Sequence, residues 1–321
     1  MTHETLLTLA DVEAARGRIG PHVRRTPVLT SDVLDGAVGA RLFFKCENLQ
    51  HIGAFKARGA TNAVFALSEA DAARGVATHS SGNHGSAVAR AAALRGLAAY
   101  IVMPEGAARP KVLQVERLGG RITYSAPTQA GREATVAEVI AATGATLIHP
   151  YDNRFVMAGQ GTAALELMED APDLDVVMAP IGGGGLISGV STAAKALRPQ
   201  IRVIGAEPAG ADDAARSLAA GRLIPLGQPD TMADGLRASL SADTFAHIQR
   251  GVDGIATVSE PAIAGAMRAL WEALKIVVEP SSAVPYAAIR EGAIDVKGKR
   301  VGIILTGGNV DLDRLPWGPG A

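Results

Sequence analysis

The sequence predicts an α/β protein built on two open, mostly parallel sheets flanked by helices, with a small domain inserted in a larger one. Two observations support this class. Short apolar runs recur along the 321 residues with helix-like stretches between them, which is the alternation of βαβ units. Hydrophobic residues make up 48% of the chain and aromatic residues only 4%, a mix that suits helices packed on buried strands better than an all-β sandwich.

Several of the apolar runs have the length of strands, and helix-like stretches lie between most of them. The expected strands cover residues 42–46, 75–79, 98–103, 121–125, 146–149, 176–181, 203–206, 254–258 and 301–305. The expected helices include residues 60–67, 84–94, 132–142, 159–168 and 186–197. Because ligands gather at the carboxyl ends of strands in open parallel sheets, the functional motifs should directly follow strands.

The middle of the chain, residues 75–144, forms a compact alternating block of its own. The strands on either side of this block look like the two halves of a second, larger sheet. We therefore expect a small domain over residues 75–144, inserted in a large domain that joins residues 1–74 to residues 145–321.

Charge and hydropathy argue against several classes of partner. The formal net charge is −1, so nothing favours binding to nucleic acid or to an anionic membrane. The longest apolar run, residues 176–194, is broken by Pro180 and four consecutive glycines and does not predict a membrane span. Residues 1–16 lack the apolar core of a signal peptide, so a cytoplasmic protein is expected. The single cysteine, Cys46, excludes an internal disulfide and should be buried at the end of its strand.

The most informative lysine is Lys56, in the run Gly-Ala-Phe-Lys-Ala-Arg-Gly-Ala from Gly53 to Ala60. It lies where a strand gives way to a helix, and the positive end of that helix would lower the pKa of its amine. An amine that is neutral near pH 7 can form a Schiff base and later act as a base. A single lysine at a helix start is more commonly an exposed surface residue.

Two turns between a strand and a helix could bind anions. The first, Ser80-Ser-Gly-Asn-His-Gly85, offers hydroxyls and free backbone N–H groups to a carboxylate, although Ser81 or Asn83 could simply cap the helix. The second, Pro180-Ile-Gly-Gly-Gly-Gly-Leu186, lacks the patterns of nucleoside triphosphatases and of dinucleotide-binding folds. A cup for the phosphate of a small cofactor fits it best, with a flexible turn as the alternative.

The run Thr306-Gly-Gly-Asn309 ends the last expected strand, and its hydroxyl could face a ring nitrogen. With the lysine run and the two turns, in this order along the chain, it resembles the fold type II (tryptophan synthase β-like) pyridoxal-phosphate enzymes. The resemblance is to the branch of serine/threonine dehydratases, serine racemases and 3-hydroxyaspartate dehydratases. It implies a pyridoxal 5'-phosphate cofactor, a small amino-acid substrate and a homodimer.

The resemblance also implies a role for individual residues. Lys56 bonds covalently to the cofactor, Phe55 packs near its ring, Asn83 bonds to the ring hydroxyl, and Thr306 faces the pyridine nitrogen. The phosphate cup is formed by Gly182, Gly183, Gly184, Gly185 and Leu186. The residues expected to contact the substrate are Ser80, Ser81, Asn83, His84 and Arg132.

A further match concerns a cation. Glu207, the carbonyl of Ala211 and Asp213 resemble the divalent-cation site of this branch, and oxygen ligands of this kind suit Mg²⁺ or Ca²⁺. The alternative is a strand end followed by an acidic helix cap.

The implied reaction removes water from an L-β-hydroxy amino acid and gives a 2-oxo acid and ammonia, with Lys56 as the general base. Ala54 before the Phe-Lys pair, together with residues 309–317, looks closer to the 3-hydroxyaspartate dehydratases. A second substrate carboxylate would then require a cation, for which Arg132 and Arg237 are candidates. The alternatives are a serine or aspartate racemase, in which Ser81 acts as a second proton donor, and a catalytically silent binding protein.

Overall fold

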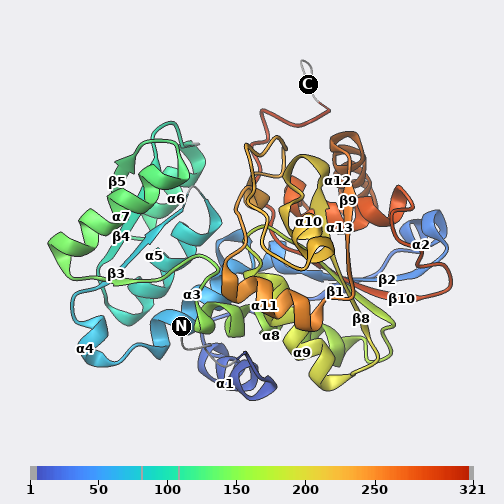
Figure 1. Cartoon of the computed structure of the whole chain (residues 1–321), viewed down its shortest axis with the longest axis horizontal. Coiled ribbons are helices and arrows are strands. Elements are labelled where there is room, and N and C mark those ends of the chain that lie inside the picture. The colour runs from blue at the N-terminus through green and yellow to red at the C-terminus, as the bar shows by residue number, and fades with distance from the viewer. Residues whose placement is uncertain (1–5, 81, 108, 318–321) are drawn as a thin grey trace.

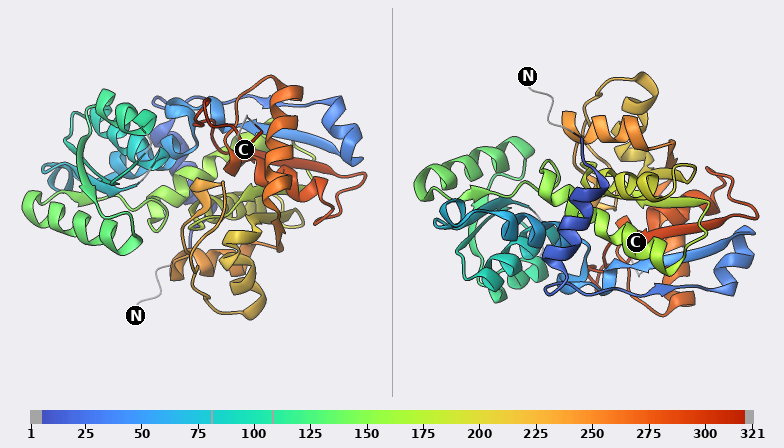
Figure 2. Two further views of the ribbon diagram at one scale, coloured as in Figure 1. Left: turned by 90° about the horizontal axis from the view of Figure 1, so that it is seen from above. Right: turned by 90° about the horizontal axis from the view of Figure 1, so that it is seen from below.

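The computed structural model describes residues 6–80, 82–107 and 109–317. The chain forms two lobes, each built around its own sheet, and α3 (Lys56–Ala66) lies at their junction (Figure 1). Seen from below in Figure 2, α1 (Leu9–Ile19) lies across this junction. None of the described helices combines the length and the hydropathy that a membrane span requires.

The large sheet has six strands in the order β1-β2-β10-β7-β8-β9. Every neighbouring pair is parallel except β1 and β2, which are antiparallel. Its strands are β1 (Val28–Leu29), β2 (Arg41–Cys46), β7 (Val176–Pro180), β8 (Arg202–Pro208), β9 (Gly254–Val258) and β10 (Arg300–Leu305).

The small sheet has four parallel strands in the order β5-β4-β3-β6. They are β3 (Val76–His79), β4 (Ala99–Pro104), β5 (Arg121–Ser125) and β6 (Thr146–Leu147). The α-helices other than α1 and α3 are α2 (Asp32–Val38), α4 (Glu69–Ala72), α5 (Asn83–Arg95), α6 (Arg109–Arg117), α7 (Gln129–Thr143), α8 (Arg154–Asp170), α9 (Gly185–Leu197), α10 (Asp213–Ala220), α11 (Ala242–Gly251), α12 (Glu260–Leu274) and α13 (Pro280–Arg290). Single 3₁₀ turns are η1 (Glu47–Leu49), η2 (His51–Gly53), η3 (Ala209–Ala211) and η4 (Asp234–Leu236).

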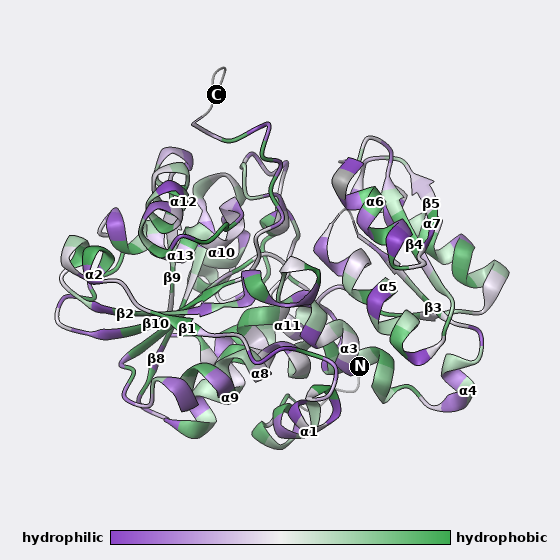
Figure 3. Cartoon of the chain, turned by 180° about the vertical axis from the view of Figure 1, so that it is seen from behind, coloured by the Kyte–Doolittle hydropathy of each residue, from purple (hydrophilic) through white to green (hydrophobic). Residues whose placement is uncertain are grey.

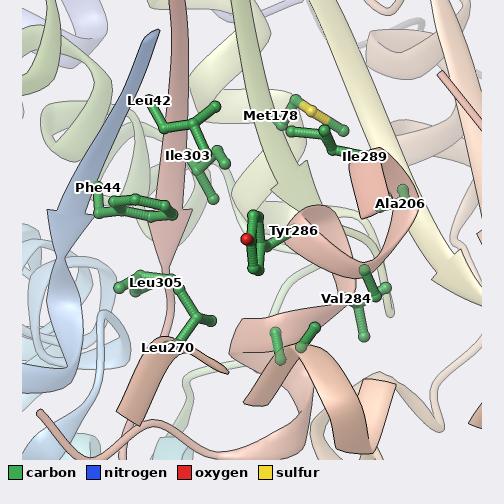
Figure 4. Close-up of a cluster of buried hydrophobic side chains, with 14 of the residues drawn as sticks. Leu42, Phe44, Met178, Ala206, Leu270, Val284, Tyr286, Ile289, Ile303 and Leu305 are labelled. Carbon is green, nitrogen blue, oxygen red and sulfur yellow. The ribbon is translucent and has the colours of Figure 1, made fainter. Parts of the chain in front are cut away.

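Each face of the large sheet is covered by a hydrophobic core. Successive strand residues point to opposite faces, so Met178 packs with α12 and α13 while Val177 packs with α8 and α9. Figure 4 shows the first of these cores, where Tyr286 of α13 lies among side chains of the strands. In Figure 3 hydrophobic residues gather on the central strands of the large lobe. Burial on both faces explains why these strands are continuous apolar runs in the sequence.

The small sheet is covered in the same way. Ile101 packs with α3, α5 and α6 on one face, and Val102 packs with α7 on the other. Since α3 also adjoins α8 of the large lobe, this helix connects the packing of the two lobes.

Four charged side chains form a buried network that joins α3 to β2, η1 and α8. Arg58 is fully buried on α3, with its Nε 2.8 Å from Glu47 Oε2 and its Nη1 2.8 Å from Glu166 Oε1. Lys45, also fully buried, donates from Nζ to Glu166 Oε2 at 2.6 Å. Two cations thus neutralise two carboxylates, and the pKa of Glu166 falls because Arg58 and Lys45 outweigh the effect of burial.

The C-terminal segment packs on the outside of the large lobe. Trp271 of α12 donates from its indole N–H to the carbonyl of Val278 at 2.9 Å. The ring of Trp317 meets the ring of Trp271 edge to face, with centroids 5.4 Å apart. The end of the described chain is therefore fixed to α12 by an aromatic pair.

The predicted fold class is confirmed, and each expected strand is present. Strands β5 and β9 have the expected bounds, and the others differ by one or two residues at an end. Cys46 is buried at the end of β2, as expected. The main differences concern element ends and one short strand. Strand β1 was missed, and β6 ends at Leu147 rather than at residue 149. Three helices begin earlier than expected: α3 at Lys56 rather than at residue 60, α7 at Gln129 rather than at residue 132, and α8 at Arg154 rather than at residue 159. Because β6 pairs with β3, the small sheet extends just beyond the expected boundary at residue 144; the division into two domains remains a prediction.

Candidate active site

The start of α3 is held by the turn that follows β10. Strands β2 and β10 are parallel neighbours, so their carboxyl ends emerge side by side. The N–H of Phe55 donates to the carbonyl of Thr306 at 2.9 Å, and Ala54 forms an antiparallel bridge with Gly307. The motifs around Lys56 and Thr306 are therefore brought together, although about 250 residues separate them.

Lys56 is the first residue of α3 and points toward the segment after β6. Its Nζ donates to the carbonyl of Pro150 at 2.7 Å and lies 5.1 Å from the centre of the Phe55 ring. Burial lowers the pKa of Lys56 to about 8. The pKa of Lys56 is thus lowered in the expected direction, and loss of hydration is the cause.

The four glycines after β7 form a turn that only glycine fits. Gly184 has φ +85°, and a Cβ at Gly183 would lie 2.4 Å from the ring of Tyr151. A Cβ at Gly185 would lie 2.8 Å from Tyr151 Cβ. The backbone N–H groups of residues 182–186 meet no acceptor among the described residues, and α9 begins here. Buried N–H donors at a helix start fit the phosphate of a cofactor.

Thr306 lies at the end of β10 and is 3% exposed. Its Oγ1 is 3.0 Å from Ser282 Oγ, which also accepts from the N–H of Gly307 at 2.7 Å. Ser282, at the start of α13, therefore orients the Thr306 hydroxyl. No motif in the sequence singled out this serine.

Asn83 does not cap α5, because the residue before the helix is Gly82 and no side chain caps it. Its Nδ2 instead donates to the two carboxylate oxygens of Glu279 at 3.0 and 3.2 Å, and its Oδ1 accepts from Asn309 Nδ2 at 2.8 Å. Burial, and then the charge of Asp234, raise the pKa of Glu279 to about 7. Glu279 and Asn309 were not predicted as site residues, although Asn309 closes one of the motifs.

His84 follows Asn83 on α5 and is 2% exposed. A carbonyl only accepts, so the contact of 3.0 Å between Nε2 and the Ile148 carbonyl places the proton on Nε2. Nδ1 has no partner among the described residues. Burial, and then the charge of Lys56, hold the pKa of His84 well below its usual value, so the ring stays neutral.

A row of three aromatic rings follows the ends of β3 and β6. The rings of His79 and His149 have centroids 5.4 Å apart, and those of His149 and Tyr151 4.7 Å apart, each pair edge to face. Burial, and then the positive charge of Arg132, lower the pKa of His79. The positive charge of Arg132 therefore influences the protonation of the first ring in this row.

The predicted substrate residues are only partly assembled. Ser80 accepts from the N–H of Gly82 at 3.2 Å, and Ser81 lies outside the described residues. Arg132 is partly buried and donates to Gln129 Oε1 at 2.6 Å. Arg237 instead donates to the carbonyl of Thr231 with its Nε at 3.0 Å.

The predicted cation ligands lie at the end of β8. Glu207 accepts from the N–H groups of Ala214 and Ala215 in the first turn of α10 at 3.2 and 2.8 Å. The residue before this helix is Asp212, whose side chain forms no cap. Asp213 accepts from Leu240 N–H at 3.2 Å, and its buried Oδ1 has no partner among the described residues. Burial is the main cause that raises the pKa of Glu207 to about 8 and that of Asp213 to about 6. Within residues 6–80, 82–107 and 109–317, no three His, Cys, Asp or Glu side chains form a metal-binding group.

The start of α3 thus carries a buried lysine whose pKa is lowered to about 8, and the end of β7 carries a turn that only glycine fits. Such an arrangement can hold a phosphorylated aldehyde through an amine. The chain belongs to the family of pyridoxal-phosphate dependent enzymes, which matches residues 19–307.

Individual relatives are similar over almost the whole chain. The beta-hydroxyaspartate dehydratase of Paracoccus denitrificans is 54% identical over 310 residues, which is 97% of this chain and 98% of that protein. The structure of maize serine racemase is 46% identical with a TM-score of 0.94, covering 96% of this chain and 95% of that one. The structure of the T.th. threonine deaminase is 44% identical with a TM-score of 0.91, covering 96% of this chain and 100% of that one.

Substituting Gly184→Ala is expected to weaken pyridoxal-phosphate binding by about 100-fold, because hydrogen bonds to a charged group contribute roughly 1.5–3 kcal/mol each. The new Cβ would lie 2.8 Å from Thr244 Cβ at φ +85°, so the turn must rotate its N–H groups. Cofactor affinity is measured by titration of the cofactor-free protein. Gly227→Ala, where nothing lies within 4 Å of the new Cβ, is the control and should bind normally. Equal affinities of the two variants would contradict the phosphate cup.

Proposed function

We propose that the protein is an ammonia-lyase that removes water from an L-β-hydroxy amino acid, with 3-hydroxyaspartate as the preferred substrate. The observation that carries this proposal is the 54% identity, over nearly the full length of both chains, to a beta-hydroxyaspartate dehydratase. A racemase of serine or aspartate is the second candidate, because serine racemases are also close relatives.

The residues present fit pyridoxal phosphate. Lys56 would bind its aldehyde, the turn from Gly182 to Leu186 its phosphate, Asn83 its ring hydroxyl and Thr306 its ring nitrogen, with Phe55 beside the ring. When bound, the cofactor supplies a sink for the negative charge that develops at the substrate α-carbon. Thr306 offers only a neutral hydroxyl paired with Ser282, so it supplies no carboxylate that would keep a proton on the ring nitrogen.

Lys56 is the group that moves the proton. With a pKa of about 8, a useful fraction of its amine is neutral near pH 7 and can accept the proton from the substrate α-carbon. The Pro150 carbonyl accepts from Nζ and fixes its direction. For racemisation a second donor on the opposite side is required, and we assign that position to Ser81. Ser80 and His84 are proposed to complete the substrate pocket.

Arg132 is proposed to bind the second carboxylate of 3-hydroxyaspartate. Its positive charge lowers the pKa of His79, the last residue of β3. The ring of His79 contacts that of His149, which lies just before Pro150. A guanidinium can bind a carboxylate through two parallel hydrogen bonds. Arg237 is the weaker candidate, because its guanidinium is committed to the Thr231 carbonyl.

Release of 2-oxo acid from L-serine, L-threonine and each diastereomer of 3-hydroxyaspartate tests this assignment. We expect the highest kcat/KM for one hydroxyaspartate diastereomer. Arg132→Ala should lower that value by about 10- to 100-fold, as for a lost hydrogen bond to a charged group, and leave serine nearly unchanged. Arg237→Ala is the matched control.

Two results would argue against this proposal. If Arg132→Ala lowered kcat/KM equally for serine and for hydroxyaspartate, Arg132 would have no role in specificity. Chiral analysis of the remaining substrate distinguishes the racemase, since interconversion of enantiomers faster than release of oxo acid would favour that candidate.

We also propose a bound Mg²⁺ or Ca²⁺ at Glu207, the Ala211 carbonyl and Asp213, supported by two buried carboxylates and the unpartnered Asp213 Oδ1. Removing the cation with a chelator should lower Tm by about 5 °C, since a ligand bound at 100 times its Kd stabilises by roughly 2.7 kcal/mol. Added Mg²⁺ or Ca²⁺ should restore it. An unchanged Tm, in protein shown by elemental analysis to be metal-free, would count against the site.

The remaining expectations are proposals as well: a homodimer in the cytoplasm, with a small domain over residues 75–144. Sedimentation at working concentration tests the dimer, and a single monomer species would exclude it.

A further inference from the structure

We propose that Asn309 is a positioning residue that holds Asn83 in one orientation and ties it to the turn that leads into Lys56. This inference rests on the proposed function, in which Asn83 contacts the cofactor ring. Asn309 Nδ2 donates to two acceptors at 2.8 Å each, the carbonyl of Ile52 and Oδ1 of Asn83. Its backbone N–H donates to Glu279 Oε2 at 3.2 Å.

Which group donates in each of these hydrogen bonds follows from the two groups that flank the pair of amides, the Ile52 carbonyl and the Glu279 carboxylate. The carbonyl of Ile52 can only accept, so the NH₂ end of Asn309 must face it. The second hydrogen of that NH₂ group then meets Asn83, which must present its oxygen. At the other end the Asn83 NH₂ group meets the carboxylate of Glu279, which accepts when ionised.

Only one orientation of the Asn83 amide satisfies both neighbours. A rotation of the amide by 180° would place its oxygen against the Glu279 carboxylate and its NH₂ group against that of Asn309. The hydrogen bond to Asn309 would be lost in either protonation state of Glu279, and the two to Glu279 would be lost while it is ionised. The setting is partly buried, where unpaired polar groups are costly. Asn309 from the large lobe therefore decides which atoms Asn83 of the small lobe presents.

Asn309 also supports a strained turn just before Ala54. Ile52 is a β-branched residue with φ +60°, a conformation that such side chains rarely adopt. Gly53 follows with φ +73°, and a Cβ there would lie 2.7 Å from Asn309 Oδ1. The N–H of Gly308 donates to the carbonyl of Gly53 at 2.9 Å. The turn that precedes Lys56 is thus held in place by residues 308 and 309.

The test compares Asn309→Ala with a matched control, Asn48→Ala. Asn48 also donates from Nδ2 to a carbonyl, that of Val277 at 3.0 Å, and it lies beside Gly308, but it has no contact with Asn83. In both variants we measure cofactor affinity, the absorption spectrum of the bound cofactor, Tm, kcat and KM.

Asn309→Ala is expected to weaken cofactor affinity by about 10-fold, to change the ratio of the cofactor absorption bands, and to lower kcat by about 10-fold, with KM changed by less than about 3-fold. Asn48→Ala should lower Tm to a similar degree and leave the spectrum and the affinity unchanged. Asn309→Asp keeps the shape but cannot donate, so its spectrum should differ from wild type at least as much as that of Asn309→Ala.

A double-mutant cycle with Asn83→Ala distinguishes positioning from a general structural role. If Asn309 acts through Asn83, then adding Asn309→Ala to Asn83→Ala changes the spectrum and the affinity by less than about 2-fold. Additive effects, or an Asn309→Ala spectrum like that of Asn48→Ala, overturn the inference. The cofactor spectrum does not depend on the substrate, so a wild type that binds the cofactor without eliminating water would refute the proposed function and leave this test intact.

Discussion

Lys56→Ala is expected to reduce the release of 2-oxo acid by about 10,000-fold, because a positioned general base alone contributes up to about that factor. The absorption band of covalently bound cofactor should disappear as well. The measurement is a direct assay of oxo acid with purified protein supplied with excess pyridoxal phosphate. Lys195→Ala is the control: this lysine lies on α9, after the glycine turn, and bonds to Asp253. Normal activity in Lys56→Ala would refute the assignment of the base.

The pH dependence of cofactor uptake gives a second measurement on the same amine. Only the neutral amine attacks an aldehyde, and at pH 7 about 10% of a group with a pKa of about 8 is neutral, against about 0.03% for a lysine at 10.5. The initial rate of uptake by cofactor-free protein should therefore rise about tenfold per pH unit below pH 8 and level off above it. A rate that continues to climb toward pH 10 would mean that burial does not lower this pKa.

Arg58→Met is expected to lower the free energy of unfolding by about 3–5 kcal/mol, the usual effect of removing one partner from a buried ion pair. The variant leaves Glu47 and Glu166 with only Lys45 to neutralise them, and all three side chains are at most 9% exposed. Urea unfolding followed by circular dichroism measures the change.

Arg268→Met is the matched control, because Arg268 and Glu272 form an exposed pair on α12 with side chains 59% and 64% exposed. Exposed pairs contribute little, so a change below about 1 kcal/mol is expected there. Equal changes in the two variants would show that the buried network does not stabilise the junction of the lobes.

Most of the fold was predictable because buried parallel strands are continuous apolar runs. Strands such as β7 and β10 are covered on both faces, and their sequences therefore identify them. Strand β1 was missed because two residues in an antiparallel pair give too short a pattern. The start of α3 was misjudged for a related reason: Lys56 and Arg58 are charged residues that turn inward, so the first turn does not look like a helix with an apolar face.

The candidate site was predictable where local chemistry required particular residues. The glycine turn and the lysine run each carry their signal within a few positions, and the structure places each beside the segment from Pro150 to Tyr151. Contacts between distant segments left no such signal. Asn83 and Glu279 are 196 residues apart, and a carboxylate before a proline at a helix start looks like an ordinary cap until the fold brings an amide to it.

The aromatic pair of Trp271 and Trp317 decides what an optical experiment on this protein can detect. These are the two tryptophans of the chain, and their rings lie in contact. Tryptophan fluorescence therefore monitors one region of the protein, the contact of the C-terminal segment with α12. This fluorescence would change when that segment detaches, even with the rest of the large lobe intact. It would stay constant while the small lobe unfolds. Tyr100 and Tyr124, on the strands of the small sheet, are the chromophores that follow that lobe.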